Sequence, residues 1–108
     1  MTFTVRFTLG ARDDLRDIHA YIEKNDCGEN ADYVAREIVR AALRLRTNPQ
    51  RGAYPPELLA LGSRAYRQVF FKPYRILYRV RGGTVFVAVI ADGRRDMTAL
   101  LARRLRPR

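Results

Sequence analysis

The alternation of hydrophobic and polar side chains along residues 66–96 predicts three consecutive β-strands. In the middle strand, residues 74–81, alternate positions form an apolar set (Tyr74, Ile76, Tyr78 and Val80) and a mainly basic set (Arg75, Leu77, Arg79 and Arg81). Successive side chains of a strand point to opposite faces, so we expect one face against the core and one cationic face. Gly82-Gly83 predicts a two-residue hairpin turn, and residues 84–91 are apolar on both faces, as in an interior strand.

Two more strands complete the predicted sheet. Residues 66–71 are aromatic and β-branched, and Lys72-Pro73 ends this strand because proline cannot donate to a β-ladder. Residues 2–7 alternate, with Phe3, Val5 and Phe7 on one face. We therefore expect a mostly antiparallel sheet of four strands, in which the N-terminal strand joins the other three.

Two amphipathic helices are predicted between the first strand and the second. Thr8 is a suitable N-cap, and the apolar positions that follow it recur at helical spacing (Ala11, Leu15, Ile18 and Ile22). Turn residues occupy positions 25–30, and a second helical stripe then runs from Ala31 to Leu45 before Asn48-Pro49 stops it. The short connection implies an antiparallel helical hairpin, which we expect to pack on the tyrosine and isoleucine face of the sheet. The fold class is therefore α+β.

The two remaining segments are less regular. Residues 49–62 are expected to form an irregular crossover in which Leu58, Leu59 and Leu61 enter the core. At the C-terminal end, Asp96 could cap a segment whose apolar positions lie near one helical stripe (Met97, Leu100, Leu101 and Leu105). That tail is either a short helix that docks on the sheet or a segment that a partner orders.

Length and composition indicate one domain, residues 1–108, without a membrane span. No apolar run approaches the roughly 20 residues that cross a bilayer, and the N-terminus does not resemble a signal peptide, so we expect a cytoplasmic protein. Cys27 is the only cysteine and His19 the only histidine, which argues against a zinc site, and we expect no metal and no cofactor. His19 itself is expected to be structural or exposed.

Charge is the strongest compositional signal, because the chain carries +10 and all but two of its 21 basic residues are arginine. Residues 1–54 hold nine basic and eight acidic residues, whereas residues 55–108 hold twelve and three. The sheet half thus carries almost the whole net charge, which suggests RNA, DNA or an acidic protein as partner. The alternative is an arginine-rich solvated surface.

Several strand arginines are candidates for that contact. Arg75 and Arg79 share a face, and we expect Arg67 to lie opposite them in the neighbouring strand, where clustered like charges favour an external anion. Tyr66, Tyr74 and Tyr78 are also on strands, and Tyr74 and Tyr78 share the parity of Ile76, so we expect all three to be core tyrosines and not catalytic residues.

In the order of its elements the chain resembles the RelE/ParE superfamily of bacterial type II toxins, and the resemblance covers nearly the whole sequence. Two segments carry it best: residues 74–78, YRILY, which look like the third strand of that family, and residues 89–96, VIADGRRD, which look like its strand-to-tail junction. The RelE-like branch, as the resemblance implies it, cleaves messenger RNA on the ribosome. Arg75 and Arg95 stand where that branch carries phosphate-stabilising arginines, but the tail from Met97 to Leu105 lacks its tyrosine or histidine, and Leu101 falls near that place.

The missing acid–base residue favours the ParE-like branch, whose members, as the resemblance implies it, inhibit DNA gyrase by binding and are neutralised by an antitoxin. We therefore expect a toxin of a plasmid-stabilisation type that is not an enzyme. It would bind its target or its antitoxin through arginines (Arg67, Arg75, Arg79, Arg94 and Arg95). The antitoxin should offer an acidic segment that lies across the sheet or the helical groove. Two alternatives stay open: a ribosome-dependent endoribonuclease acting on mRNA, and an inactive member that only binds antitoxin.

Overall fold

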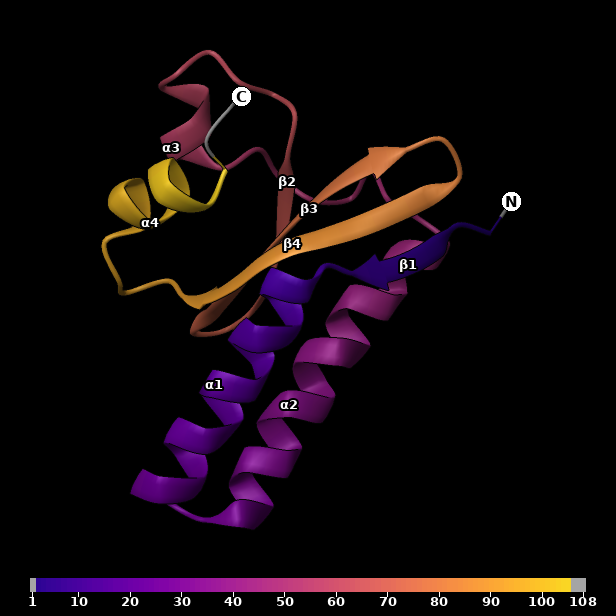
Figure 1. The fold of residues 1–108 in the computed structure, drawn as a ribbon. Helices are drawn as coiled ribbons and strands as arrows, with labels where there is room; N and C mark the ends of the chain where they lie inside the picture. Colours follow the sequence, from indigo (N-terminus) through magenta and orange to yellow (C-terminus); the bar gives the residue numbers. More distant parts are fainter. Residues whose placement is uncertain (1, 106–108) are drawn as a thin grey trace.

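The sheet of four strands, flanked by helices on both faces, forms the centre of the molecule (Figure 1). The computed structural model describes residues 2–105. The elements in chain order are β1 (Thr4–Phe7), α1 (Leu9–Asn25), α2 (Gly28–Leu43), the 3-10 turn η1 (Arg44–Arg46), α3 (Pro56–Leu59), β2 (Arg67–Phe71), β3 (Tyr74–Arg81), β4 (Thr84–Asp92) and α4 (Met97–Arg104). Within the described residues, no helix is long and apolar enough to cross a membrane.

The strand order is β1-β4-β3-β2, so the prediction of a mostly antiparallel four-stranded sheet is confirmed. Strands β2, β3 and β4 pair antiparallel, whereas β1 pairs parallel with β4, Thr4 beside Thr84. The chain reaches this parallel arrangement because the helical hairpin and two further strands intervene before β4. As its two-sided apolar pattern predicted, β4 lies in the interior of the sheet.

Helices α1 and α2 form the predicted hairpin and cover one face of the sheet. Thr8 caps α1 through its hydroxyl, which accepts a hydrogen bond from the Ala11 N–H at 3.1 Å. The buried cluster on this face joins both helices to β3 and β4 (its members include Ala11, Ile38, Leu45, Ile76, Tyr78, Val85, Val87 and Ile90). Helix α2 ends at Leu43, and η1 carries Leu45 into the same core.

The opposite face of the sheet is a second core and not the solvated cationic face that strand alternation predicted. Leu77 and Val89 are fully buried there under α3 and α4, with Leu58, Met97, Leu100 and Leu101. Of the three leucines expected to enter the core from the crossover, Leu58 does so, whereas Leu59 and Leu61 are exposed. The tail is therefore the docked helix, the first of the two alternatives that its sequence allowed.

A β-bulge in β4 lets that strand serve both cores. Leu77 pairs with Val89 and Tyr78 pairs with Val87, so Ala88 is an extra residue without a partner in β3. Because the bulge changes the parity of the strand, Val87 and Ile90 both face the helical hairpin, while Val89 faces α3 and α4.

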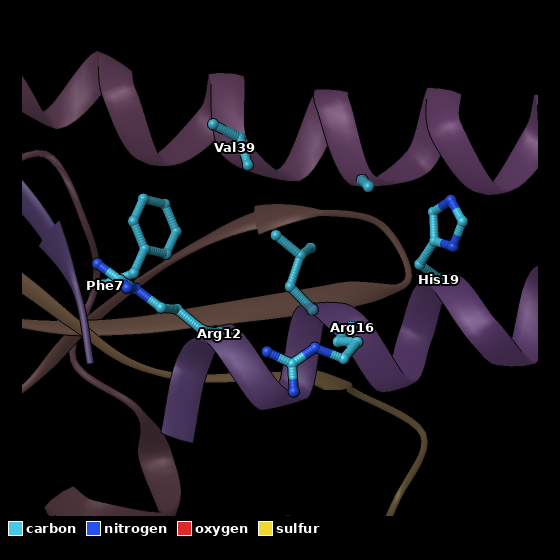
Figure 2. A pocket seen from close by; sticks show the side chains of 7 residues that line it. Phe7, Arg12, Arg16, His19 and Val39 are labelled. Atoms are coloured by element: carbon cyan, nitrogen blue, oxygen red, sulfur yellow. The ribbon is translucent and has the colours of Figure 1, made fainter. Parts of the chain in front are cut away.

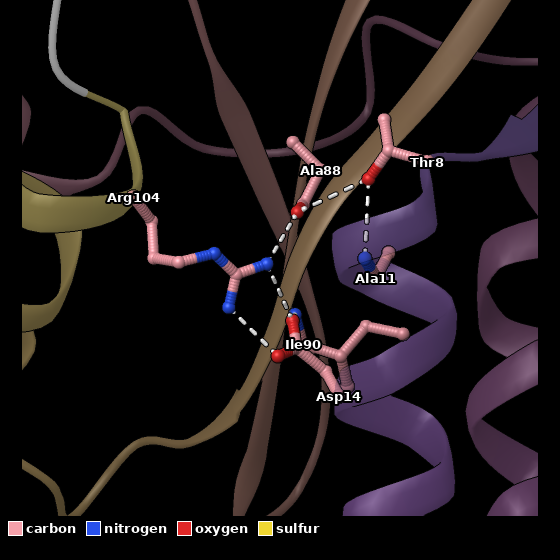
Figure 3. Close-up of polar contacts among 6 residues, drawn as sticks. All are labelled: Thr8, Ala11, Asp14, Ala88, Ile90 and Arg104. Atoms are coloured by element: carbon pink, nitrogen blue, oxygen red, sulfur yellow. Dashed lines mark hydrogen bonds and ion pairs between the residues drawn. The ribbon is translucent and has the colours of Figure 1, made fainter.

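The atoms of the bulge are held by α1 and α4 (Figure 3). The Ala88 carbonyl accepts a hydrogen bond from Arg104 Nη2 at 3.1 Å and from the Thr8 hydroxyl at 3.4 Å. Asp14 accepts from both guanidinium Nη atoms of Arg104, at 2.7 and 3.0 Å, and from the Ile90 N–H at 2.9 Å. One carboxylate thus joins α1, the irregular part of β4 and the C-terminal helix.

The fully buried Tyr78 ties the crossover to the sheet, and removing its hydroxyl should destabilise the fold. That hydroxyl donates to the Pro49 carbonyl at 2.6 Å and accepts from the Gly52 N–H at 3.1 Å. Tyr78→Phe leaves both backbone groups unpaired, so we expect a loss of about 1–3 kcal/mol in the free energy of unfolding. Urea unfolding should show no comparable loss for Tyr33→Phe, since Tyr33 is about half exposed. Equal stability of the two variants would mean that this bridge contributes nothing.

Candidate functional site

Arg75, the strand arginine that the sequence placed first among the site residues, is held in an internal ion pair. Its Nη1 and Nη2 donate to the two carboxylate oxygens of Glu57 at 2.9 and 2.7 Å, and its Nε donates to Gln68 Oε1 at 2.7 Å. The side chains of Arg75 and Glu57 are only 10% and 20% exposed. The hydrogen bond from Arg75 is the main reason that the pKa of Glu57 lies below its ordinary value, against an opposing effect of burial.

The aliphatic part of Arg75 is buried as well. A Cβ atom added to Gly93 would lie 2.9 Å from Arg75 Cδ, so the chain after β4 passes over this side chain only because residue 93 is glycine. Arg75 thus connects β3, α3 and the turn after β4. All three guanidinium nitrogen atoms of Arg75 have partners within the protein, so Arg75 is not free to bind an external anion in this arrangement.

Arg67 and Arg79 do not form one cluster with Arg75, contrary to the prediction. In the register of β2 and β3, Arg67 pairs with Tyr78, and Arg75 pairs with Phe70. Cross-strand partners share a face, so Arg67 leaves edge strand β2 on the Tyr78 side, whereas Arg75 and Arg79 leave β3 on the other side. Arg67 and Arg79 nevertheless line one cleft where β2 begins, and Arg75 is not part of it. The expectation failed because the register depends on the Lys72-Pro73 turn, which alternation alone does not fix.

Arg94 and Arg95 line a cleft of about 430 Å3 between α1 and the turn after β4. Arg94 is exposed and binds Asp92, with Nη2 to Oδ2 at 2.6 Å, and this hydrogen bond is the main cause of the lowered pKa of Asp92. Acidic and aromatic side chains share the lining (Asp14, Asp17, Tyr21 and Tyr74). Arg95 has no ion pair within residues 2–105, so it is the predicted arginine at this end of the sheet with its charge available.

A second surface lies between the two long helices, where Figure 2 shows Phe7, Val39 and His19 along an open groove. The groove measures about 410 Å3, is mainly apolar and is completed by Leu15 and Ala35. Arg12 and Arg16 stand on its α1 side. The sequence analysis did not predict this groove, because its apolar positions, such as Leu15, were assigned to the helical stripes that face the core.

Burial disfavours the tyrosinate form of Tyr74 and Tyr78 by raising the pKa of both phenols. Burial raises the pKa of Tyr74, with a further contribution from Asp92, so its phenol is a weaker source of tyrosinate than an exposed tyrosine. Burial likewise raises the pKa of Tyr78, whose hydroxyl is already occupied by the crossover. His19 lies in the helical groove with Nε2 at 2.7 Å from Asp32 Oδ1, as expected for a structural residue.

Residues 5–97 match the family model of the ParE toxin of type II toxin-antitoxin systems, parDE. The chain belongs to this family. Curated protein sequences gave no significant match. The assignment fits the arrangement above, with the helical hairpin on one face and the docked tail on the other.

Solved structures of ParE and RelE toxins have the same fold. The chromosomal ParDE system of P. aeruginosa matches with a TM-score of 0.71 and 20% identity, over 84% of this chain and 96% of that chain. The RelBE2 toxin-antitoxin complex of Mycobacterium tuberculosis matches with a TM-score of 0.62 and 25% identity, over 85% and 99%. A mutant of the E. coli toxin RelE in the free state gives 0.65 and 13%, over 99% and 100%. These likenesses confirm the RelE/ParE superfamily that the sequence resembled.

The Glu57–Arg75 pair should contribute to stability in a pH-dependent way. Glu57→Gln leaves a largely buried guanidinium without its counter-charge, so we expect a loss on the order of 3 kcal/mol at neutral pH. Because the pKa of Glu57 is lowered in the folded state, the stabilisation is present above its ordinary value of 4.5 and is lost as the pH falls through the folded-state pKa.

Urea unfolding of the wild type and Glu57→Gln across this pH range is the measurement. The matched control is Asp13→Asn, whose partner Arg16 is exposed, and it should cost less than about 1 kcal/mol at any of these pH values. The free energy of unfolding of wild type and that of Glu57→Gln should converge at low pH. If their difference stayed constant down to pH values well below 4.5, that result would contradict the role of the ionised carboxylate.

Proposed function

We propose that this type II toxin acts by binding DNA gyrase and not by cleaving RNA. The observation that carries the proposal is the capture of Arg75 by Glu57 and Gln68. A ribonuclease of the RelE kind needs an arginine at this place to stabilise a pentacoordinate phosphate, and preorganised charge of that sort acts only if it faces the reacting group. Here the guanidinium is neutralised and covered.

The C-terminal helix α4 also supports binding over RNA cleavage. Met97, Leu100 and Leu101 are buried against the sheet, at the place where an RNA-cleaving relative would need a polar acid or base. Tyr74, with its raised pKa, does not replace that group. A toxin that only binds its target requires neither an acid nor a base, so the gyrase hypothesis fits these residues better.

The partner that we propose for the helical groove is the amphipathic segment of a cognate antitoxin. The related ParDE and RelBE structures are toxin-antitoxin systems, which supports a partner of this kind. Phe7, Leu15 and Val39 offer apolar contact, while Arg12 and Arg16 offer charge to acidic residues at the rim. The +10 net charge of the toxin favours an acidic antitoxin segment over a basic one.

A charge placed in the groove should separate antitoxin binding from folding. Ala35→Glu puts a bulky carboxylate among the apolar lining, and we expect the affinity for the antitoxin to fall at least about tenfold, or 1.4 kcal/mol. Ala20→Glu is the matched control, because Ala20 is an exposed helical alanine that does not line the groove. Calorimetric titration with a cognate antitoxin gives the affinities, and thermal melts verify folding. Equal affinities for the two variants would place the antitoxin elsewhere.

The target is tested by brief expression of the toxin followed by examination of both gyrase and messenger RNA. We expect gyrase–DNA cleavage complexes to accumulate while translating messages stay intact. With purified gyrase, Arg95→Ala should weaken the effect on the order of tenfold, because this arginine forms no ion pair with the residues that the structure describes. Arg36→Ala, on the exposed surface of α2, should leave the effect unchanged.

Codon-phased cuts in messages on purified ribosomes would overturn the gyrase assignment and favour the ribonuclease. A specific observation already bears on that alternative, since such activity requires Arg75 to leave Glu57. If Arg75→Ala abolished the cuts and Glu57→Gln increased them, the ion pair would act as a restraint on catalysis. No response of either target would favour a member that binds only antitoxin.

A further inference from the structure

Where β2 begins beside β3, a cleft of about 200 Å3 brings together three arginines from separate parts of the chain. Arg64 comes from the connection before β2, Arg67 from β2 and Arg79 from β3, and Tyr54 and Gln50 of the crossover complete the polar lining. We call this the arginine–tyrosine cleft. It shares no lining residue with the helical groove or with the cleft at Arg94 and Arg95.

The cleft is held in place by stacking and hydrogen bonds. The guanidinium carbon of Arg67 lies 4.4 Å from the centroid of the Tyr54 ring, and that of Arg64 lies 5.9 Å from the same ring. Arg67 also donates to the Gly52 carbonyl at 2.8 Å and to the Tyr54 hydroxyl and Gln50 Oε1 at 3.0 Å. These neutral partners fix the position of Arg67 but do not cancel its charge.

No carboxylate balances the three positive charges. Acidic residues are absent from the lining, and none of the three arginines forms an ion pair within residues 2–105. Arg79 stacks at 5.3 Å over Tyr66, and its Nε–H is shielded from solvent without an acceptor in the described part of the chain. A donor left in this state is costly, and an oxyanion toward which the guanidinium could turn would remove the cost.

We propose that the arginine–tyrosine cleft binds a phosphate group of a nucleic-acid backbone. Its size suits one phosphate, and guanidinium groups match phosphate oxygens in geometry and charge. Tyrosine rings and the arginines beside them can also stack with the bases of a single strand. This inference goes beyond the proposed function, because it assigns a ligand to a surface whichever cellular target the toxin has.

An acidic peptide fits the cleft less well than a nucleic acid does. Protein partners bind through an apolar centre that expels water, and the polar lining here offers little of it. The helical groove offers that apolar surface instead, with its arginines at one side. The chain therefore separates a surface suited to an amphipathic protein segment from one suited to phosphate.

The test is fluorescence anisotropy of a labelled single-stranded oligothymidylate with the purified full-length toxin over a series of salt concentrations. We expect Arg64→Gln and Arg79→Gln each to weaken binding about three- to tenfold and to flatten the salt dependence by about 0.7 in the log–log slope, the value for one lost phosphate contact. Arg36→Gln, which removes the same charge from the exposed surface of α2, should change neither quantity by as much.

Thermal melts of the variants show whether they fold, and the exposed Arg64 provides a decisive variant even if Arg79→Gln proves unstable. Equal losses for Arg64→Gln and Arg36→Gln would overturn the proposal, because binding would then follow total charge and not this cleft. Unchanged binding of both cleft variants would overturn it as well. Displacement of the oligonucleotide by poly-glutamate more readily than by unlabelled oligonucleotide would assign the cleft to an acidic protein instead.

Discussion

The fold depends on burying both faces of β4, a strand whose sequence is apolar on both sides. A short chain has few elements for two cores, and β4 meets this requirement by an extra residue at Ala88, which redirects the side chains that follow. The bulge exposes the Ala88 carbonyl and the Ile90 N–H to new partners, and Arg104 and Asp14 supply them. Both the docking of α4 and the seating of α1 therefore depend on one irregularity in one strand.

The same constraint explains how the arginines are allocated. The two arginines with largely buried ion pairs each have a carboxylate from another element: Glu57 of α3 accompanies Arg75 of β3, and Asp14 of α1 accompanies Arg104 of α4. Burial of an unpaired charge would cost more than a small domain can tolerate. At the uncovered end of the sheet, by contrast, stacking on tyrosine and bonds to neutral oxygens hold Arg67 without cancelling its charge. Arg75 and Arg104 thus join elements of the fold through ion pairs, whereas the charge of Arg67 is not cancelled by its hydrogen-bond partners.

The four strands and both long helices could be predicted from sequence, because β1 to β3 alternate, β4 is a short run apolar on both faces and the helices have apolar positions at helical spacing. The tail had a helical stripe, but its sequence left open whether it docks on the sheet or is ordered by a partner. Alternation could not distinguish Arg75 from Arg79, since both fall on the same side of β3. The difference comes from Glu57, eighteen residues upstream, and from the closeness that Gly93 allows. One signal was available: Glu57 is the only carboxylate between Glu37 and Asp92, and a lone acid in a basic segment is a candidate for a buried pair.

The crossover, residues 49–62, contacts both the ion-paired Arg75 and the unpaired Arg67. Its Glu57 binds Arg75, its Tyr54 hydroxyl accepts a hydrogen bond from Arg67, and its Pro49 carbonyl accepts one from the Tyr78 hydroxyl. Its sequence nevertheless lacks a long periodic pattern. Patterns report elements that bury one face, whereas a segment held by single hydrogen bonds leaves no period in the sequence. The residues that prevent Arg75 from acting on an external phosphate, and those that keep Arg67 available for one, thus belong to the same short segment.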